Sequence, residues 1–340
     1  MADGCKASIE SSDQLAASLD ELLAVEPHLP YANFPPVAAK TGAAASLNRQ
    51  RWLAPTSLGV VVARDTKGRP QAAVRLENRV FESAHFGIRM AKVDRPLGVA
   101  DRVARTEALR AALQHAFATL RTMGYVHVAV RASTADRAAC WVAQELGAFH
   151  VDTQVVWMGD APGIRKPQQL PPGVWLEVYD GERLDVLSDL PWAQLLAWSS
   201  QGFDHGPLVF DHTLPYERAV QVYYEWTKRA MTGEWADAVV VARNDEGIVA
   251  FASMQRIEDL SAAAGAIVVG RGLAATLPEY RGLFTAIEHE IEAAQPAGAQ
   301  YIENETQVAT VGSVNVYAKL GCRYMGSTNN YHRRLDDGRP

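Results

Sequence analysis

An arginine and a glycine stand side by side where an apolar run gives way to a helix-forming run. Residues 276–287 read TLPEYRGLFTAI, follow the apolar β run at 265–269, and contain Arg281 and Gly282. Unpaired N–H groups and the positive end of the helix dipole would point out of such a turn, and glycine lets the backbone approach an anion closely. The turn therefore indicates a phosphate site, and a plain helix cap explains it equally well.

A second group of polar residues lies near the C-terminal end. Residues 303–307 read ENETQ, and the helix predicted over 310–319 carries Tyr317. A tyrosine phenol, with a pKa of about 10, suits a general acid that protonates a leaving thiolate. Tyr317 taken alone also fits a core position beside Val314 and Leu320, so its role depends on its surroundings.

The elements that would hold these groups occur twice. A helix–strand–helix–strand unit covers 105–158 and again 283–335, and a Leu-Gly pair stops the shorter helix of each copy. A hairpin with polar turn residues precedes each unit, at 59–75 and at 238–253. The repetition predicts an α/β fold of two similar domains, each a mixed, mostly antiparallel sheet flanked by helices. Two unrelated α/β segments are the other explanation.

A proline- and glycine-rich segment separates the two copies. Residues 159–173 read GDAPGIRKPQQLPPG and show no hydrophobic period, which is typical of a linker. We therefore expect a first domain over 1–158, a linker over 159–173 and a second domain over 174–340.

Composition and charge narrow the classes of function. Lys and Arg number 33 against 39 for Asp and Glu, a formal charge of −6, so the chain lacks the basic character of nucleic-acid-binding proteins. The three cysteines are far apart, which argues against a disulfide scaffold or a zinc ribbon. The apolar runs are far shorter than the ~20 residues of a membrane span, and 1–20 has no signal-peptide pattern. We expect a cytoplasmic protein without nucleic-acid or membrane partners.

Taken together, the order of strand, PEYRG loop, helix, strand, tyrosine-bearing helix, Leu-Gly and final strand resembles the GCN5-related N-acetyltransferases (GNAT). Within that family the chain is most similar to enzymes that acetylate a nucleotide-linked 4-amino-4,6-dideoxygalactose. The resemblance covers most of 80–158 and 200–335 and implies tandem GNAT-like domains. Further matching stretches are FESAHFGI at 81–88, YYEW at 223–226, Thr306-Gln307 followed by Tyr317, and NYHR at 330–333.

The resemblance implies acetyl-CoA as the acyl donor and no metal. It implies that the pantetheine lies along 265–277 and the pyrophosphate on the Arg-Gly turn. The cofactor-binding residues would be Leu277, Arg281, Gly282, Leu283, Phe284, Thr285 and Thr310. Tyr317 would be the general acid toward the CoA thiolate. A base or a water chain must take the proton of the attacking amine. Its candidates are Glu303, Glu305, His205 and Asp211, and we expect Glu305 to be catalytic together with Tyr317.

The acceptor implied by the resemblance is a small molecule, a nucleotide-activated amino sugar. The loops over 189–216 are rich in aromatic and histidine side chains, which suit a sugar ring and a base, and which ordinary loop packing explains equally well. The residues expected to bind the acceptor are Phe203, His205, Asp211, Tyr223 and Gln307.

The sequence departs from the family pattern in both copies. Phe284 stands where the phosphate loop of the family carries a glycine, and Thr310 stands where it often has an asparagine. The first copy has no Arg-Gly turn over 91–102, and Cys140-Trp141 stands near the place of the tyrosine. We therefore expect the first copy to be catalytically inert and acetyl-CoA to bind only the second.

Two other functions fit the sequence. One is an acyltransferase of the same fold that acts on another amine, such as an antibiotic or an amino acid. The other is a non-catalytic protein that binds acyl-CoA or a partner as a sensor. Tyr317 with Arg281 favours an enzyme, and the glycine-poor loop favours a sensor. Motifs of dinucleotide, P-loop, zinc protease and serine hydrolase sites are missing, and a homodimer is compatible with the sequence.

Overall fold

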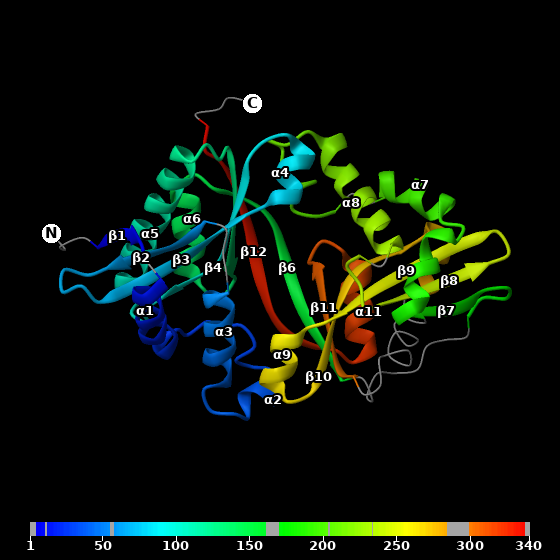
Figure 1. Ribbon diagram of the computed structural model, residues 1–340, viewed down its shortest axis with the longest axis horizontal. Helices are drawn as coiled ribbons and strands as arrows, with labels where there is room; N and C mark the ends of the chain where they lie inside the picture. Colours follow the sequence, from blue (N-terminus) through cyan, green and yellow to red (C-terminus); the bar gives the residue numbers. More distant parts are fainter. Residues whose placement is uncertain are drawn as a thin grey trace. The chain divides into compact units, whose positions relative to one another are not determined.

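The chain divides into two units that are not continuous in sequence (Figure 1). The computed structural model describes residues 5–10, 12–54, 58–160, 170–202, 205–232, 234–283 and 299–336. The first unit holds Met1–Gln154, Phe210–Leu214 and Gly326–Pro340, and the second holds Val155–Val209 and Pro215–Met325. The sequence predicts one boundary, at 159–173, whereas the contacts assign a short internal segment and the end of the chain to the first unit.

The sheet of the first unit has the strand order β1-β2-β3-β4-β5-β12-β6. Strands β4 and β5 pair in parallel, and β1–β2, β2–β3, β3–β4 and β5–β12 pair antiparallel. The elements are β1 (Lys6–Ile9), α1 (Ser12–Val25), α2 (Pro35–Ala38), α3 (Ala43–Leu53), β2 (Gly59–Arg64), β3 (Pro70–Asn78), α4 (Val80–Phe86), β4 (Met90–Gly98), α5 (Arg102–Thr122), β5 (His127–Ser133), α6 (Arg137–Glu145), β6 (Phe149–Asp160) and β12 (Arg323–Arg334). Strands β6 and β12 contribute residues to both units.

The second unit repeats this arrangement with the strand order β11-β10-β9-β8-β7. Strands β10 and β11 pair in parallel, and the other neighbours pair antiparallel. The elements are β7 (Trp175–Asp180), the 3₁₀ segment η2 (Gly181–Asp189), α7 (Ala193–Gly202), α8 (Tyr216–Met231), β8 (Ala238–Asn244), β9 (Gly247–Arg256), α9 (Glu258–Ala264), β10 (Ile267–Thr276), the 3₁₀ segment η3 (Pro278–Leu283), β11 (Ala299–Gln307) and α11 (Val311–Leu320). The predicted α/β fold of tandem domains with mixed, mostly antiparallel sheets is confirmed.

Both sheets contain the same irregularity at the same place. In β10, the three steps from Arg271 to Ala274 oppose two steps of β9, and in β4 the three steps from Asp94 to Leu97 oppose two steps of β3. One extra residue on one strand is a β-bulge, which bends the strand and increases its twist. The predicted duplication therefore extends to a detail that no hydrophobic pattern encodes.

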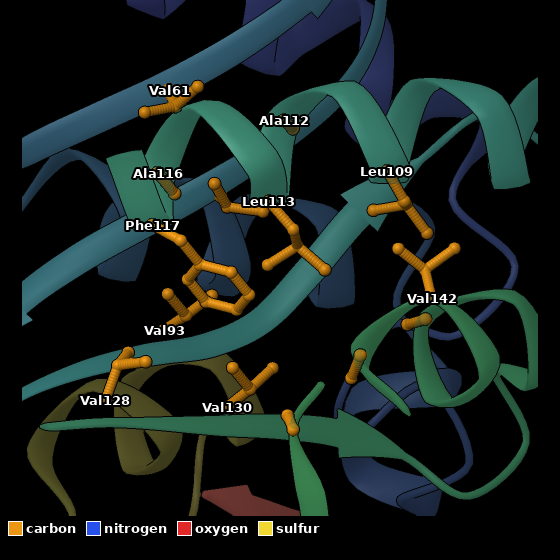
Figure 2. Packing of buried hydrophobic residues seen from close by; sticks show 14 of the residues in the cluster. Val61, Val93, Leu109, Ala112, Leu113, Ala116, Phe117, Val128, Val130 and Val142 are labelled. Carbon is orange, nitrogen blue, oxygen red and sulfur yellow. The ribbon is translucent and has the colours of Figure 1, made fainter. Parts of the chain in front are cut away.

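The core of the first unit lies between α5 and the sheet. One face of α5 is fully buried at helical spacing, with Ala108, Leu109, Ala112, Leu113, Ala116 and Leu120. Figure 2 shows Leu113 and Phe117 pointing toward Val128 and Val130 of β5. Small alanines bring the helix axis close to the strands, and the larger side chains fill the gaps between them. None of the described helices is both long and apolar enough to cross a membrane.

The predicted Leu-Gly stops end α6 and α11 in the same way. Gly147 and Gly321 adopt φ of 82° and 84°, a left-handed conformation that favours glycine. The residue after each glycine donates its N–H across the turn, from Ala148 to the Ala143 carbonyl and from Cys322 to the Tyr317 carbonyl, each at 3.0 Å. The two bonds are equivalent, so Ala143 occupies in the first copy the position of Tyr317 in the second. Cys140 and Trp141, which the sequence places near that position, lie three and two residues before it.

Candidate active site

The candidate site lies where β10 separates from its parallel partner β11. The pairing runs from Ile267↔Ala299 to Gly270↔Glu303, whereas β10 continues to Thr276 and β11 to Gln307. Beyond Glu303 the two strands no longer pair with each other, so the fork between them presents backbone N–H and C=O groups. Such groups require partners when buried, and an extended ligand with amides can supply them.

The bulge in β10 is held by a close approach to β9. Ser253 is buried and donates its hydroxyl to the carbonyl of Leu273 at 3.1 Å. A Cβ atom added to Gly272 would lie 2.6 Å from the Ser253 Oγ, closer than side-chain atoms approach one another. A larger residue at position 272 would therefore displace the Ser253 hydroxyl, which is bonded to the bulge.

Tyr317 is buried on α11, within the apolar core of the second unit. Its hydroxyl accepts a hydrogen bond from Nη1 of Arg271 at 3.0 Å, and the guanidinium carbon of Arg271 lies 5.4 Å from the centre of its ring. Arg271 follows Gly270, the last residue of β10 that pairs with β11. The hydrogen bond from Arg271 therefore links the buried phenol of Tyr317 to the point where β10 and β11 separate.

Two buried polar atoms in the strands beyond the fork are without partners among the described residues. They are Oδ1 of Asn304 in β11, whose side chain is fully buried, and Oγ1 of Thr276 in β10. The amide nitrogen of Asn304 is 3.9 Å from Sγ of Cys322. A buried acceptor without a donor is costly and marks a place where a ligand or water supplies one.

Sequence reasoning did not single out Arg271 or Asn304 as site residues. The signal for Arg271 was a lone charge within the apolar run 267–277, and the signal for Asn304 was an amide at an inward position of a strand. Neither signal identifies a site without knowledge of the fork.

The far end of β10 leads into the expected phosphate turn. Leu277 is buried in the core, and its N–H is bonded to the Val249 carbonyl at 2.9 Å. Tyr280 accepts a hydrogen bond from Nδ2 of Asn244 at 3.0 Å, which ties the turn to the β8–β9 hairpin. Arg281, Gly282 and Leu283 follow as the last residues of η3, whereas Phe284 and Thr285 lie outside the described residues.

The end of β11 is closed by a turn into α11. Thr310 occupies the N-terminal cap position of α11 and donates its N–H to the Gln307 carbonyl at 3.0 Å. Its hydroxyl lies 3.5 Å from Oε1 of Gln307. Glu303 is half-buried and Glu305 is exposed on β11. The structure thus joins Tyr317 to Arg271, and it places the polar residues of 303–310 on and after the part of β11 that no longer pairs with β10.

The expected acceptor residues divide between the two units. In the second unit, a Cβ on Gly206, which follows His205, would lie 1.7 Å from the hydroxyl of Tyr223, so glycine allows this tyrosine of α8 to approach the loop. Gly206 has a φ of 135°, which also favours glycine. The ring of Tyr223 packs edge-on against Trp226. Phe203 lies outside the described residues.

Asp211 belongs to the first unit, where it is buried between two histidines. Its Oδ2 lies 2.8 Å from Nε2 of His127 and 2.6 Å from Nδ1 of His332, while Oδ1 accepts bonds from the N–H and hydroxyl of Thr213. Burial opposes ionisation, but the bonds from both histidines hold the pKa of the Asp211 carboxyl well below its usual range. Both of its oxygens are engaged within the first unit.

The first copy differs from the second at the start of the helix after its bulged strand. Arg105 of α5 is buried and bonded to Glu26 at 3.0 Å, to Asp136 at 2.5 Å and to the Gly98 carbonyl at 2.6 Å. The Glu26 carboxylate in turn accepts the N–H of Gly98 at 2.7 Å. These groups satisfy one another at the strand-to-helix turn, which in the second copy is the expected phosphate site.

Comparisons with known proteins bear on the fold. No protein-family model matches the chain, and no curated protein matches it either. Among solved structures it is similar over 98% of its length to a GCN5-related N-acetyltransferase from Sphaerobacter thermophilus, with a TM-score of 0.61, 14% identity and 97% of that chain covered. It is also similar to a tandem GNAT protein from the clavulanic acid biosynthesis pathway, with a TM-score of 0.53, 15% identity, and coverage of 98% of this chain and all of that one.

A third similar structure is a glucosamine N-acetyltransferase region in a fungal multi-domain beta-N-acetylglucosaminidase. Its TM-score is 0.55 at 15% identity, over 98% of this chain and 38% of that one. The chain therefore has the tandem GNAT fold. None of these proteins is described as a dTDP-fucosamine acetyltransferase.

Proposed function

We propose that the protein is an acetyl-CoA-dependent N-acetyltransferase whose second copy is the active one. The observation that carries the proposal is the position of Tyr317. Its buried phenol stands on the helix beside the β10–β11 fork and is bonded to Arg271, the first residue of β10 beyond the pairing. The first copy has Ala143 at the equivalent position, so it has no corresponding acid.

The residues of the fork fit the chemistry of an acyl-CoA. Pantetheine carries two amide groups, and the fork offers strand edges together with the acceptor Oδ1 of Asn304 and the hydroxyl of Thr276. We assign the pyrophosphate to Arg281 and Gly282, with Leu277, Leu283, Phe284, Thr285 and Thr310 around it, as the GNAT resemblance implies. Acetyl-CoA, when bound, supplies the activated acetyl group.

Arg271 directs the proton of Tyr317. A guanidinium has N–H donors and no acceptor, so the hydrogen bond between them makes the phenol oxygen the acceptor. The hydroxyl hydrogen of Tyr317 must then point away from Arg271, and in the proposed reaction the phenol donates it to the thiolate that develops in the fork. Arg271 thus acts as a positioning residue for the general acid, while Glu305 or Glu303 on β11 would receive the proton of the attacking amine.

The acceptor we propose is the amino group of a nucleotide-linked amino-deoxysugar, as in dTDP-fucosamine acetyltransferase. The support is the sequence resemblance over 81–88, 223–226 and 330–333. In the second unit, the buried Tyr223 packs against the loop of His205 and Gly206, and we propose that these residues line one side of the acceptor site. Phe203, Gln307 and Asp211 remain candidates from sequence, and the bonds of Asp211 to His127 and His332 give it a structural role as well.

A panel of acceptors tests the proposal. Release of free CoA thiol from acetyl-CoA is measured with nucleotide-linked amino sugars, free amino sugars, aminoglycosides and amino acids. We expect turnover with a nucleotide-linked amino sugar and none without an acceptor. Turnover with an unlinked amine alone would overturn the acceptor assignment. Binding of acetyl-CoA without turnover on any amine would favour a sensor over an enzyme.

A further inference from the structure

A groove on the first unit has no part in the proposed reaction. It lies between the first turns of α5 and α6 and encloses a volume of about 500 Å³. Arg102, Val103, Glu107 and Arg110 line it from α5, and Arg137 and Trp141 line it from α6. The volume falls within the range of roughly 300–1,000 Å³ that is typical of small-molecule sites.

The groove carries an excess of positive charge. Arg110 is engaged by the Glu145 carboxylate, at 2.8 and 3.0 Å, and Glu107 is the one carboxylate in the lining. Arg102 and Arg137 have no carboxylate within ion-pair distance among the residues that the structure describes. Two guanidiniums are therefore available to an anion.

The placement of these two arginines costs stability. Arg102 and Arg137 are the first residues of α5 and α6, and each follows an aspartate cap, Asp101 or Asp136. A cation in the first turn of a helix faces the positive end of the helix dipole, which is unfavourable. Because the Asp101 and Asp136 side chains already accept the N–H groups of Ala104 and Ala139, an anion in the groove would be held by the two arginines, whose charge it would offset.

Trp141 adds an aromatic surface to the same groove. Its side chain is 57% exposed, although it belongs to a helix whose other face is buried in the core. Arg110 lies 5.7 Å from the centre of its ring and is held there by Glu145. An exposed indole backed by a fixed cation is a stacking platform for a flat aromatic group.

We propose that this groove binds a phosphorylated aromatic compound of the size of a nucleoside diphosphate. The base would stack on Trp141, and the phosphates would pair with Arg102 and Arg137, which suit phosphate through their two-pronged geometry. A free nucleotide and the nucleotide portion of a larger molecule share this chemistry. None of the residues that line the groove is among those assigned to the proposed reaction.

Calorimetric titration with ADP tests the proposal in the full chain carrying Arg281→Gln, so that the assigned pyrophosphate site of the second unit does not contribute. We expect about one site per chain, and at least tenfold weaker binding by adenosine and by inorganic phosphate. We also expect Trp141→Ala, and separately the pair Arg102→Gln with Arg137→Gln, to weaken ADP binding at least tenfold. Higher salt should weaken ADP binding as well.

A matched control removes two positive charges elsewhere on the first unit. Lys40→Gln with Lys67→Gln, both exposed, should leave ADP binding unchanged. Displacement of ADP by acetyl-CoA in the Arg281→Gln protein would assign the groove to the nucleotide portion of a larger molecule, and its absence would assign it to free nucleotides. Failure of ADP to bind, or binding that survives both groove variants, would overturn the proposal.

Discussion

Tyr317 distinguishes the two copies at the residue scale. The C-terminal turns of α6 and α11 make equivalent backbone hydrogen bonds, but the same position holds Ala143 in α6 and Tyr317 in α11. The tyrosine is bonded to Arg271, a residue that only the second copy's fork supplies. The difference between an inert and an active copy is therefore expected to reside in a few side chains on a common scaffold.

We expect Tyr317→Phe to lower turnover by about 10²–10⁴-fold and to leave the affinity for acetyl-CoA nearly unchanged, because the phenol acts on charge that develops in the transition state. Loss of one buried hydroxyl costs only about 1 kcal/mol of stability. Rates, affinity and melting temperature are measured on the same sample. Tyr179→Phe is the matched control, since it removes a core hydroxyl bonded to Glu177 in the same unit. An unimpaired rate in Tyr317→Phe contradicts the assignment.

We expect Arg271→Gln to slow the reaction through Tyr317 rather than independently. The double variant Arg271→Gln with Tyr317→Phe should be no slower than Tyr317→Phe alone, because the guanidinium acts only by directing the phenol. Comparison of kcat for the four proteins measures this coupling. Rate losses that multiply in the double variant would instead mean that Arg271 has a role of its own.

At the scale of elements, buried polar clusters decide how segments of the first unit are held together. Arg105 joins α5 to Glu26 after α1 and to Asp136 before α6. Asp211 joins the segment 210–214 to β5 and β12 through His127 and His332. Both clusters link residues that are far apart along the chain, so neither is visible in the sequence.

We expect Arg105→Met to destabilise the protein by about 3–5 kcal/mol, because two buried carboxylates lose the cation that compensates them. The matched control is Arg110→Met on the same helix, whose more exposed pair with Glu145 is worth about 0–1 kcal/mol. The free energy of unfolding is measured in urea at pH 7. Equal effects of the two substitutions would contradict the structural role of the Arg105 cluster.

We expect acid to destabilise the first unit through its histidines. Burial lowers the pKa of His332 from 6.5 to about 4 and also lowers the pKa of His127, although Asp211 opposes both shifts. His127 and Arg79 reinforce the shift of His332, and Arg79 and Arg334 reinforce that of His127. A lowered histidine pKa means that the unfolded chain takes up the proton first. The contribution of the buried, neutral histidines to the free energy of unfolding is therefore fully present above about pH 6.5. It falls as the pH drops toward 4, by up to about 3 kcal/mol for His332.

Urea midpoints between pH 7 and pH 4.5 measure this loss. His332→Gln should flatten the dependence on pH, and His150→Gln, at an exposed position of the same unit, should leave it unchanged. A wild-type slope in the His332 variant would show that other groups cause the loss. Below about pH 4, protonation of Asp211 adds a loss of the same sign, since its pKa is also lowered.

At the scale of the whole molecule, the two copies share a fold but differ at the turn between the bulged strand and the following helix. Both copies keep the bulged strand and the Leu-Gly helix stop. In the first, the strand-to-helix turn is filled by the bonds of Arg105, whereas the second has the Arg-Gly turn there. The backbone of the first copy's turn is thus satisfied by its own side chains, which is why we assign the pyrophosphate of acetyl-CoA to the second copy alone.

We therefore expect acetyl-CoA to occupy about one productive site per chain. The calorimetric titration is made with the Trp141→Ala protein, which keeps nucleotide binding at the α5–α6 groove out of the count. Arg281→Gln, added to it, should abolish the remaining site, because it removes the cation of the phosphate turn. Two sites, or loss of binding on changing residues 91–102 alone, would contradict this assignment.

The sequence by itself determined the local elements of both copies. The hairpins at 59–75 and 238–253, the helix over most of 105–123 and the Leu-Gly stops all lie within a few residues of their predicted positions. Alternating or helical hydrophobic spacing and turn glycines act over short distances, so a single chain reveals them. The role proposed for Tyr317 came from the GNAT resemblance together with its place in a helix that ends at Leu320-Gly321.

Only the tertiary structure decided which distant residues meet. The last strand pairs with β5 of the first unit, Thr328↔Ser133 to Arg334↔His127, although it follows the second copy in sequence. Asp211 is bonded to His127 and His332, and Arg271 of β10 is bonded to Tyr317 of α11, although none of these partners is near in sequence. Strand pairing and buried hydrogen bonds are satisfied by whichever partner the folded chain brings near, and spacing along the sequence does not encode that choice.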